Sequence, residues 1–435
     1  MREVNLGEFC LERNLHSSKA RKLDVLAQLQ NAWEAQGDVD PDEWRAQAQR
    51  LKRLRDDLNG HVERLHFLPM PRAPLPAAEC CTLTRAALSW GSRREVAAMD
   101  VAAAPPYIEE VMDVEEIKHR SIETNGIRMH IAELGTGPLV VMCHGFPESW
   151  YSWRHQLRAL ANAGYHAVAP DMRGYGQTDA PEAVDQYTLL HLVGDIVGLV
   201  DALDAKQAVV AGHDWGAPVA WHAALLRPDK FRGVIGLSVP YRPRSPVAPT
   251  TLMPKTEAAE FYQLYFQKPG IAETEFERDP RRTVHSMLYG GSGDRPPREP
   301  GAPVGMVARD GGFLVGGSDP LPLPPWLTRA DVDFYANEFA RTGFRGGLNW
   351  YRNIDRNWEL LGPFKGARVT VPALYMAGDR DMVVAFKGAN ELIANLKSFV
   401  PNLKQTIMLP GCGHWTQQER AAEVNAAMVT FLNDL

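Results

Sequence analysis

Asp214 stands in a stretch whose residue types suit a nucleophile. It follows the apolar run 208–211 and lies between Gly212 and Gly216. The run predicts a buried strand, and residues 217–226 predict a helix that begins directly after it. Glycine suits so tight a turn because the two backbones come close together. A carboxylate there is ionised at neutral pH and can attack an electrophilic carbon, so we expect Asp214 to be the nucleophile of a nucleophile elbow. The simpler interpretation is that Asp214 only caps the helix.

Two further loops supply an acid and a histidine. Asp379 and Asp381 follow the apolar run 371–377, and His414 follows the run 405–409. A neutral imidazole can take a proton from water, and a carboxylate behind it fixes its tautomer and stabilises the cation. The residues alone leave open which aspartate does this. The chain order of nucleophile, acid and histidine is that of the α/β-hydrolase fold.

The elements around these loops predict an α/β architecture. From residue 117 onward apolar runs alternate with helical segments, which indicates a mostly parallel sheet flanked by helices. The loop 144–147 follows the apolar run 139–143, and a parallel sheet places such a loop at its carboxyl edge, where ligands bind. Backbone N–H groups of this loop are therefore candidates for binding substrate.

The changes of pattern along the chain predict four parts. Residues 1–112 form a helical extension with Pro/Ala-rich linkers, and residues 113–240 form the first part of the core. Residues 241–345 are rich in Pro and Gly and form an inserted helical cap, and residues 346–435 complete the core.

Tyrosines in the predicted cap are candidates for binding a substrate oxygen. Tyr262 and Tyr265 belong to one predicted helix, and Tyr335 to a second helix that begins after Thr328 with a capping box. A loop is expected from 290 to 325. Buried phenol hydroxyls need hydrogen-bond partners, although most tyrosines in such apolar surroundings are simply packed.

The sequence of the N-terminal extension does not indicate a catalytic activity. Its clearer helix begins at Asp40 and carries a nearly heptad-spaced apolar stripe, which indicates docking on the main domain or self-association as a homo-oligomer. The stripe consists of Trp44, Ala48, Leu51, Leu54, Leu58, Val62 and Leu65. Met99 and Met112 both precede the first strand pattern, so the functional protein could begin at either.

Composition excludes several classes of function. The 47 Lys and Arg residues against 53 Asp and Glu residues make a net charge of −6, which provides no basic field for nucleic acid. No apolar run approaches the roughly 18 residues of a membrane span, so we expect no membrane association and a cytoplasmic location. The five cysteines have no C-x-x-C spacing and are expected to be reduced thiols. Three scattered histidines, His144, His213 and His414, lack the spacing of a metal site.

Four motifs together resemble those of soluble epoxide hydrolases, over roughly residues 113–435. They are HGFPESW (144–150), GHDWG (212–216), YQLYFQ (262–267) and GHW (413–415). The resemblance implies Asp214 as nucleophile, His414 as base and Asp381, not Asp379, as the orienting acid.

The resemblance also implies the substrate contacts. Tyr262 and Tyr335 would hold the epoxide oxygen, with Tyr265 the alternative that the residues alone leave open. The backbone N–H groups of Phe146 and Trp215 would form the oxyanion hole. We expect further substrate contacts from three aromatic residues, Trp150, Tyr265 and Trp350.

The implied reaction converts a small-molecule epoxide and water into a vicinal diol through an ester on Asp214, with no cofactor or metal. Two alternatives remain at this point. A haloalkane dehalogenase shares the aspartate elbow followed by Trp, and a ligand-binding member of the fold would have no activity.

Overall fold

The structure of the chain is a computed structural model, and it describes residues 116–296, 304–314 and 323–435. The predicted extension 1–112, with its helix after Asp40 and both candidate start methionines, lies outside the described residues. So do three of the cysteines, Cys10, Cys80 and Cys81. The other two, Cys143 and Cys412, are buried free thiols.

One eight-stranded sheet forms the core, in the order β1-β2-β4-β3-β5-β6-β9-β10. The pairs β1·β2 and β2·β4 are antiparallel, and the remaining pairs are parallel. The strands are β1 (Lys118–Thr124), β2 (Ile127–Leu134), β3 (Leu139–Cys143), β4 (His166–Pro170), β5 (Ala208–His213), β6 (Phe231–Leu237), β9 (Ala373–Gly378) and β10 (Leu403–Leu409). The mostly parallel sheet of the α/β-hydrolase fold is confirmed.

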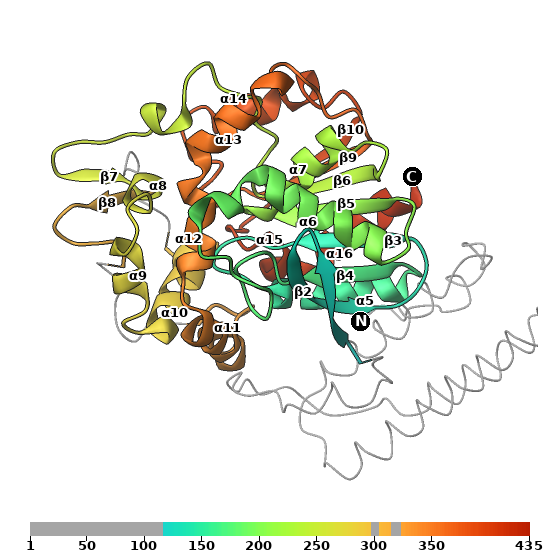
Figure 1. Cartoon of the computed structure of the whole chain (residues 1–435), viewed down its shortest axis with the longest axis horizontal. Coiled ribbons are helices and arrows are strands. Elements are labelled where there is room, and N and C mark those ends of the chain that lie inside the picture. Colours follow the sequence, from blue (N-terminus) through green and yellow to red (C-terminus); the bar gives the residue numbers. More distant parts are fainter. Residues whose placement is uncertain (1–115, 297–303, 315–322) are drawn as a thin grey trace, which may run out of the picture. The chain divides into compact units, whose positions relative to one another are not determined.

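Helices cover both faces of this sheet (Figure 1). Side chains alternate along each parallel strand: Val140 and Met142 of β3 join one apolar cluster, and Leu139 and Val141 join the other. The first cluster includes α5 (Arg154–Asn162) and α16 (Ala421–Asn433), and the second includes α6 (Leu189–Ala202) and α7 (Gly216–Leu226). Burial on both faces explains why these strands are continuous apolar runs.

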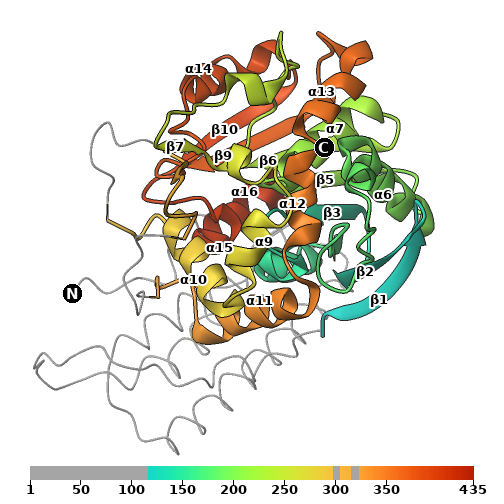
Figure 2. The same ribbon diagram turned by 60° about the vertical axis from the view of Figure 1, so that its left-hand side comes forward.

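The carboxyl ends of the parallel strands gather the candidate site. Because β3, β5, β9 and β10 run in the same direction, the loops that follow them meet at one edge of the sheet. Figure 2 shows these strands together in the sheet. Helices α9 (Ile271–Phe276) and α12 (Arg345–Arg352) belong to the segment between β6 and β9.

The segment between β6 and β9 holds the elements that the sequence assigns largely to a cap (Figure 1). Its further elements are β7 (Ala259–Phe261), α8 (Tyr262–Tyr265), α10 (Pro280–Gly291), β8 (Met306–Ala308), α11 (Arg329–Thr342) and α13 (Ile354–Leu360). The capping box at the start of α11 is present: Thr328 Oγ1 accepts from Asp331 N, and Asp331 Oδ2 accepts from Thr328 N.

The cap contains more regular structure than the sequence indicates. Helices α9 and α10 and the short strand β8 were not predicted, and β8 falls within the expected loop 290–325. Helix α10 has a readable start, since Asp279 caps it through Arg282 N and Pro280 occupies its first turn. Helix α9, with 6 residues, is too short to stand out by its apolar period alone.

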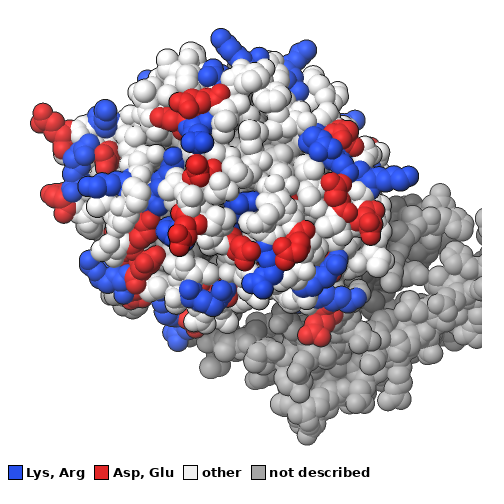
Figure 3. All heavy atoms as spheres, in the orientation of Figure 1, with Lys and Arg blue, Asp and Glu red and all other residues white. Residues whose placement is uncertain are grey.

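Charge is mixed over the surface. On the face drawn in Figure 3, acidic and basic side chains alternate across the described residues without a broad field of one sign. In the described part of the chain, no helix has the length and apolar character to cross a membrane.

Candidate active site

The turn from β5 to α7 places Asp214 at a sharp corner. Asp214 has a φ of +50°, in the left-handed region that non-glycine residues rarely adopt. A Cβ on Gly212 would collide with the carbonyl oxygen of Gly216, and a Cβ on Gly216 would collide with that of Cys143. Both glycines are therefore required by close backbone approach, and the strained corner turns the Asp214 carboxylate out of the sheet edge.

His414 lies between two carboxylates. Its Nε2 is 3.4 Å from Asp214 Oδ2, and its Nδ1 is 3.0 Å from Asp381 Oδ1. Asp381 is fully buried at its side chain, whereas His414 and Asp214 keep 7 % and 13 % of their side-chain surface exposed. The nucleophile and the base are therefore the members of this set that a small molecule can reach.

Electrostatics couple these three groups. Burial opposes the charge on Asp214, but the hydrogen bond and charge of His414 hold the pKa of this carboxyl below its usual value. The pKa of Asp381 is lowered in the same way, against burial, mainly by His414. Burial also opposes the charge on His414, yet Asp381 and Asp214 raise its pKa well above its usual value. The free site therefore favours an imidazolium between two carboxylates.

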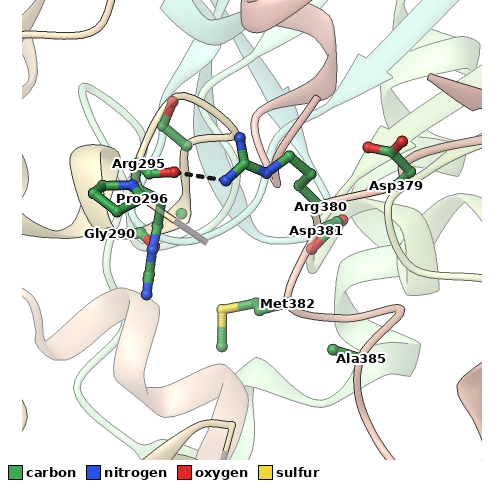
Figure 4. A pocket seen from close by; sticks show the side chains of 10 residues that line it. Gly290, Arg295, Pro296, Asp379, Arg380, Asp381, Met382 and Ala385 are labelled. Atoms are coloured by element: carbon green, nitrogen blue, oxygen red, sulfur yellow. Dashed lines mark hydrogen bonds between the residues drawn. The ribbon is translucent and has the colours of Figure 1, made fainter. Parts of the chain in front are cut away.

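The two aspartates after β9 have different surroundings. Asp379 is exposed and accepts a hydrogen bond from Gly411 N at 2.8 Å. A pocket of about 190 Å³ lies beside this loop and is lined in part by Asp379, Arg380 and Asp381, and Arg380 donates to the carbonyl oxygen of Arg295 (Figure 4). Of the two candidate acids, Asp381 is the one that contacts His414.

The loop after β3 closes on the nucleophile. Phe146 N donates to Asp214 Oδ1 at 2.8 Å. A Cβ on Gly145 would lie 2.7 Å from Trp215 N, so the loop and the elbow are in direct contact. Of the two predicted oxyanion donors, Phe146 N thus contacts the Asp214 carboxylate, and Trp215 N lies beside the same loop.

A buried glutamate that the sequence analysis did not single out fixes this loop. Glu148 Oε2 accepts from Gly145 N at 3.1 Å and lies 2.7 Å from His213 Nδ1. The other ring nitrogen of His213 lies 2.7 Å from the carbonyl oxygen of His414. Glu148 and His213 therefore tie the oxyanion loop, the elbow and the base loop together.

Further side chains hold the loop that carries His414. Glu419 Oε2 accepts from Gly413 N at 2.8 Å, and its Oε1 accepts from Trp415 N at 3.0 Å. Ser238 Oγ lies 3.1 Å from His414 Nδ1. No spacing pattern marks Ser238 in the sequence, because it lies 176 residues from His414 and meets this loop only through the fold.

The two tyrosines of α8 differ in what they contact. Tyr265 Oη donates to Glu275 Oε2 at 2.6 Å, so its hydroxyl is occupied. Tyr262 Oη accepts from Gln263 Nε2, which leaves its own proton available. Burial, and next the charge of Asp214, raise the pKa of Tyr262. Tyr262 is thus the tyrosine of this helix on whose pKa the charge of Asp214 acts.

Tyr335 is placed elsewhere. It is fully buried in α11, and its Oη donates to Gln418 Oε1 at 3.2 Å. The charge of Asp214 is not among the main causes of its raised pKa, which are burial and then Arg154 and Glu148.

Tyr351 of α12, which the sequence analysis did not name, lies among the aromatic residues beside the nucleophile elbow. Its ring centroid lies 5.2 Å from Trp215 and 6.0 Å from Tyr262. Burial, and next the charges of Asp214 and Tyr262, raise its pKa well above its usual value. The sequence alone did not distinguish Tyr351 from its neighbour Trp350, because both are aromatic residues of the same short helix.

The remaining aromatic candidates pack against other groups. Trp350 is fully buried and donates from Nε1 to the carbonyl oxygen of Arg173, with its ring 6.2 Å from Trp215. Trp150 packs on His119 and Phe334.

Within the described residues, no group of three or more His, Cys, Asp or Glu side chains is arranged to hold a metal ion.

Known proteins are similar to this chain in sequence and in fold. The family model described as alpha/beta hydrolase fold matches residues 138–301. The chain is 45 % identical to Epoxide hydrolase A of Mycobacterium tuberculosis over 321 residues, 73 % of this chain and 97 % of that protein. The crystal structure of Epoxide Hydrolase A from Mycobacterium thermoresistibile is 47 % identical, with a TM-score of 0.68 over 73 % of this chain and 98 % of that one. An epoxide hydrolase from an endophytic Streptomyces is 46 % identical, with a TM-score of 0.70 over 73 % and 96 %. The chain therefore belongs to the epoxide hydrolases of the α/β-hydrolase fold.

Proposed function

We propose that this enzyme opens epoxides with the Asp214 carboxylate and hydrolyses the resulting ester to a vicinal diol. The observation that carries the proposal is the arrangement around Asp214. His414 Nε2 lies 3.4 Å from its carboxylate, and the ring of Tyr351 lies 5.2 Å from that of Trp215, the next residue, and 6.0 Å from that of Tyr262. A carboxylate nucleophile, an acid for the leaving oxygen and a base for water are what this reaction requires.

In the first step Asp214 attacks a ring carbon, and the electrons of the breaking C–O bond go to the ring oxygen. Tyr262 and Tyr351 donate hydrogen bonds to this developing alkoxide. Their raised pKa keeps both phenols protonated at neutral pH, which suits them as donors. The geometry supports Tyr351 as the second donor in place of Tyr335, whose hydroxyl is bonded to Gln418.

Formation of the ester prepares the second step. Asp214 loses its negative charge, which removes one of the two carboxylates that raise the pKa of His414. His414 then gives up a proton, which balances the proton that the alkoxide takes up. The neutral imidazole, oriented by Asp381, can now accept a proton from water.

Hydrolysis restores the starting state. Water attacks the ester carbonyl carbon while its proton passes to His414, and the N–H groups of Phe146 and Trp215 stabilise the tetrahedral oxyanion. Collapse releases the diol, with the leaving oxygen taking the remaining hydroxyl proton. Asp214 returns as a carboxylate beside imidazolium.

The test is product analysis with aryl and alkyl epoxides and with haloalkanes. We expect diol from the epoxides, no halide from the haloalkanes, and no diol from Asp214→Ala. Halide release without epoxide turnover would contradict the proposal, as would unchanged activity of Asp214→Ala.

We also propose the four-part division at residues 112, 240 and 345, a cytoplasmic location, and, for the helix after Asp40, docking on the main domain or self-association. The helices between β6 and β9 support the cap. The apolar stripe after Asp40 supports docking or self-association.

A further inference from the structure

Ser238 directly follows β6, at the same edge of the sheet as the candidate site. Its φ of +66° lies in the left-handed region. The other described non-glycine residues with positive φ are Asn125, Asp204 and Asp214, whose types tolerate this region better than serine does. Such strain persists only where the surrounding structure enforces it. The neighbours of Ser238 therefore hold it in this conformation.

The adjacent strand β9 supplies this restraint. Ser238 N donates to the carbonyl oxygen of Met376 at 2.8 Å, and the Ser238 carbonyl oxygen accepts from Tyr375 Oη at 2.7 Å. The Ser238 side chain is fully buried, and its Oγ lies 3.1 Å from His414 Nδ1. The strained backbone thus fixes a buried hydroxyl beside the base.

The contacts of His414 Nδ1 define the direction of this hydroxyl. Asp381 Oδ1 lies 3.0 Å from the same nitrogen, so Nδ1 carries a hydrogen that both oxygens can accept. The hydrogen of the Ser238 hydroxyl then needs another acceptor, because buried donors are almost always bonded. Asp381 Oδ2 is the complementary group, since it is buried and accepts no hydrogen bond from any other described residue. Against the effect of burial, His414 and then the Ser238 hydroxyl lower the pKa of Asp381.

We propose that Ser238 is a positioning residue for ester hydrolysis, whose hydroxyl accepts from His414 Nδ1 and donates to the Asp381 carboxylate. The inference rests on the proposed function and adds a residue to its second step. With the hydrogen kept on Nδ1, the Nε2 lone pair of neutral His414 faces Asp214 and the attacking water. The hydrogen bond to Asp381 also disperses the carboxylate charge, so this charge holds a proton on the imidazole less strongly. Ser238 thus orients the base and helps it to become neutral.

Other ionisable groups surround His414 and Asp381, and substitution of Ser238 retains all of them. They are Asp214 and His213 at the end of β5, Tyr262 of α8, Tyr375 of β9, Asp379, Cys412, Glu419 of α15 (Thr416–Glu419) and Arg242 after β6. Of these groups, Asp214 loses its charge when the ester forms. A shift in the pH dependence of ester hydrolysis therefore reports the effect of the missing hydroxyl on Asp381 and His414.

The test follows both steps against pH in single turnovers of styrene oxide. Ser238→Ala should move the acid limit of hydrolysis to higher pH by about 0.5–1 unit, because the charge-assisted bond to Asp381 is stronger than the lost bond from Nδ1. Below that limit hydrolysis should slow by about 3- to 10-fold, which corresponds to this shift, while ester formation stays nearly unchanged. Ser238→Gly, which lacks the hydroxyl and also relieves the backbone strain, should show the same shift.

Ser152→Ala is the matched control, because Ser152 is equally buried and its hydroxyl donates to the carbonyl oxygen of Ser149 at 3.0 Å. It should leave the pH dependence of hydrolysis unchanged. In folded Ser238 variants, an unshifted acid limit, or an equal slowing of ester formation and hydrolysis, would overturn the inference and leave the proposed function intact. Absence of a covalent ester in turnovers of the unsubstituted chain would overturn both.

Discussion

At the scale of single residues, the charge of Asp214 links the two chemical steps. While Asp214 is ionised, it and Asp381 favour a protonated His414. Once Asp214 is esterified, only Asp381 continues to do so. The nucleophile therefore controls the protonation of the base, and the base becomes competent only after the nucleophile has reacted.

This coupling predicts different acid limits for the two steps. The lowered pKa of Asp214 keeps the nucleophile ionised below its usual range, so ester formation should persist at acid pH. Hydrolysis needs neutral His414, and the remaining charge of Asp381 still raises its pKa, so hydrolysis should fail first as pH decreases. Stopped-flow tryptophan fluorescence, with Trp215 next to the nucleophile, can follow both steps. A common acid limit for both steps would argue against the coupling.

Single substitutions can distinguish the roles of the three tyrosines in ester formation. Tyr262→Phe and Tyr351→Phe should each slow ester formation by about 10²-fold, because each removes a donor to the developing alkoxide. Tyr335→Phe should have little effect on that rate, since its hydroxyl contacts Gln418. Single-turnover rates of the three variants provide the measurement. A large decrease in this rate for Tyr335→Phe, with an unchanged rate for Tyr351→Phe, would instead support Tyr335 as the second donor to the epoxide oxygen.

At the scale of elements, the sequence predicts the core residues better than the cap residues. Asp214, Asp381 and His414 each follow a buried strand, and parallel strands bring their carboxyl ends to one edge. Their meeting follows from topology, so it could be predicted. The choice between Asp379 and Asp381 rested on family resemblance, because the direction of each side chain depends on the local turn.

The positions of the cap side chains cannot be predicted from strand order in this way. Tyr335 and Tyr351 lie on different helices, and their orientation depends on how α11 and α12 pack rather than on any period in the sequence. Glu148 and Glu419 also connect segments that are distant in sequence: Glu148 Oε2 lies 2.7 Å from His213 Nδ1, and Glu419 Oε2 accepts from Gly293 N at 2.8 Å. Such contacts have no sequence signature.

We expect substitution of Gly212, at the corner between β5 and α7, to lower the stability of the fold. Gly212→Ala places a methyl group against the Gly216 carbonyl, so we expect a loss of about 1–3 kcal/mol in the free energy of unfolding, with reduced activity. Gly290→Ala, where an added Cβ meets nothing within 4 Å, is the control and should be neutral. Urea denaturation of both variants measures the difference. Equal stability of the two would show that the corner tolerates a side chain.

At the scale of the whole molecule, every proposed site residue lies between Phe146 and His414. The similar proteins cover 73 % of this chain and nearly all of their own length. A chain beginning at Met112 should therefore keep the kcat of the full chain within about twofold, in line with the small effects of changes away from a site. Steady-state assays of both forms test this. A loss of turnover in a folded truncated chain would assign the extension a role in catalysis.

The most direct test of the covalent mechanism removes the base and preserves the nucleophile. In His414→Gln, ester formation can proceed, but hydrolysis should slow by about 10²–10⁴-fold. Intact-protein mass spectrometry after mixing with epoxide should then show an increase of one epoxide mass, located by peptide mapping on Asp214. A folded variant that binds epoxide without a mass increase, or that carries the adduct on another residue, would contradict the account.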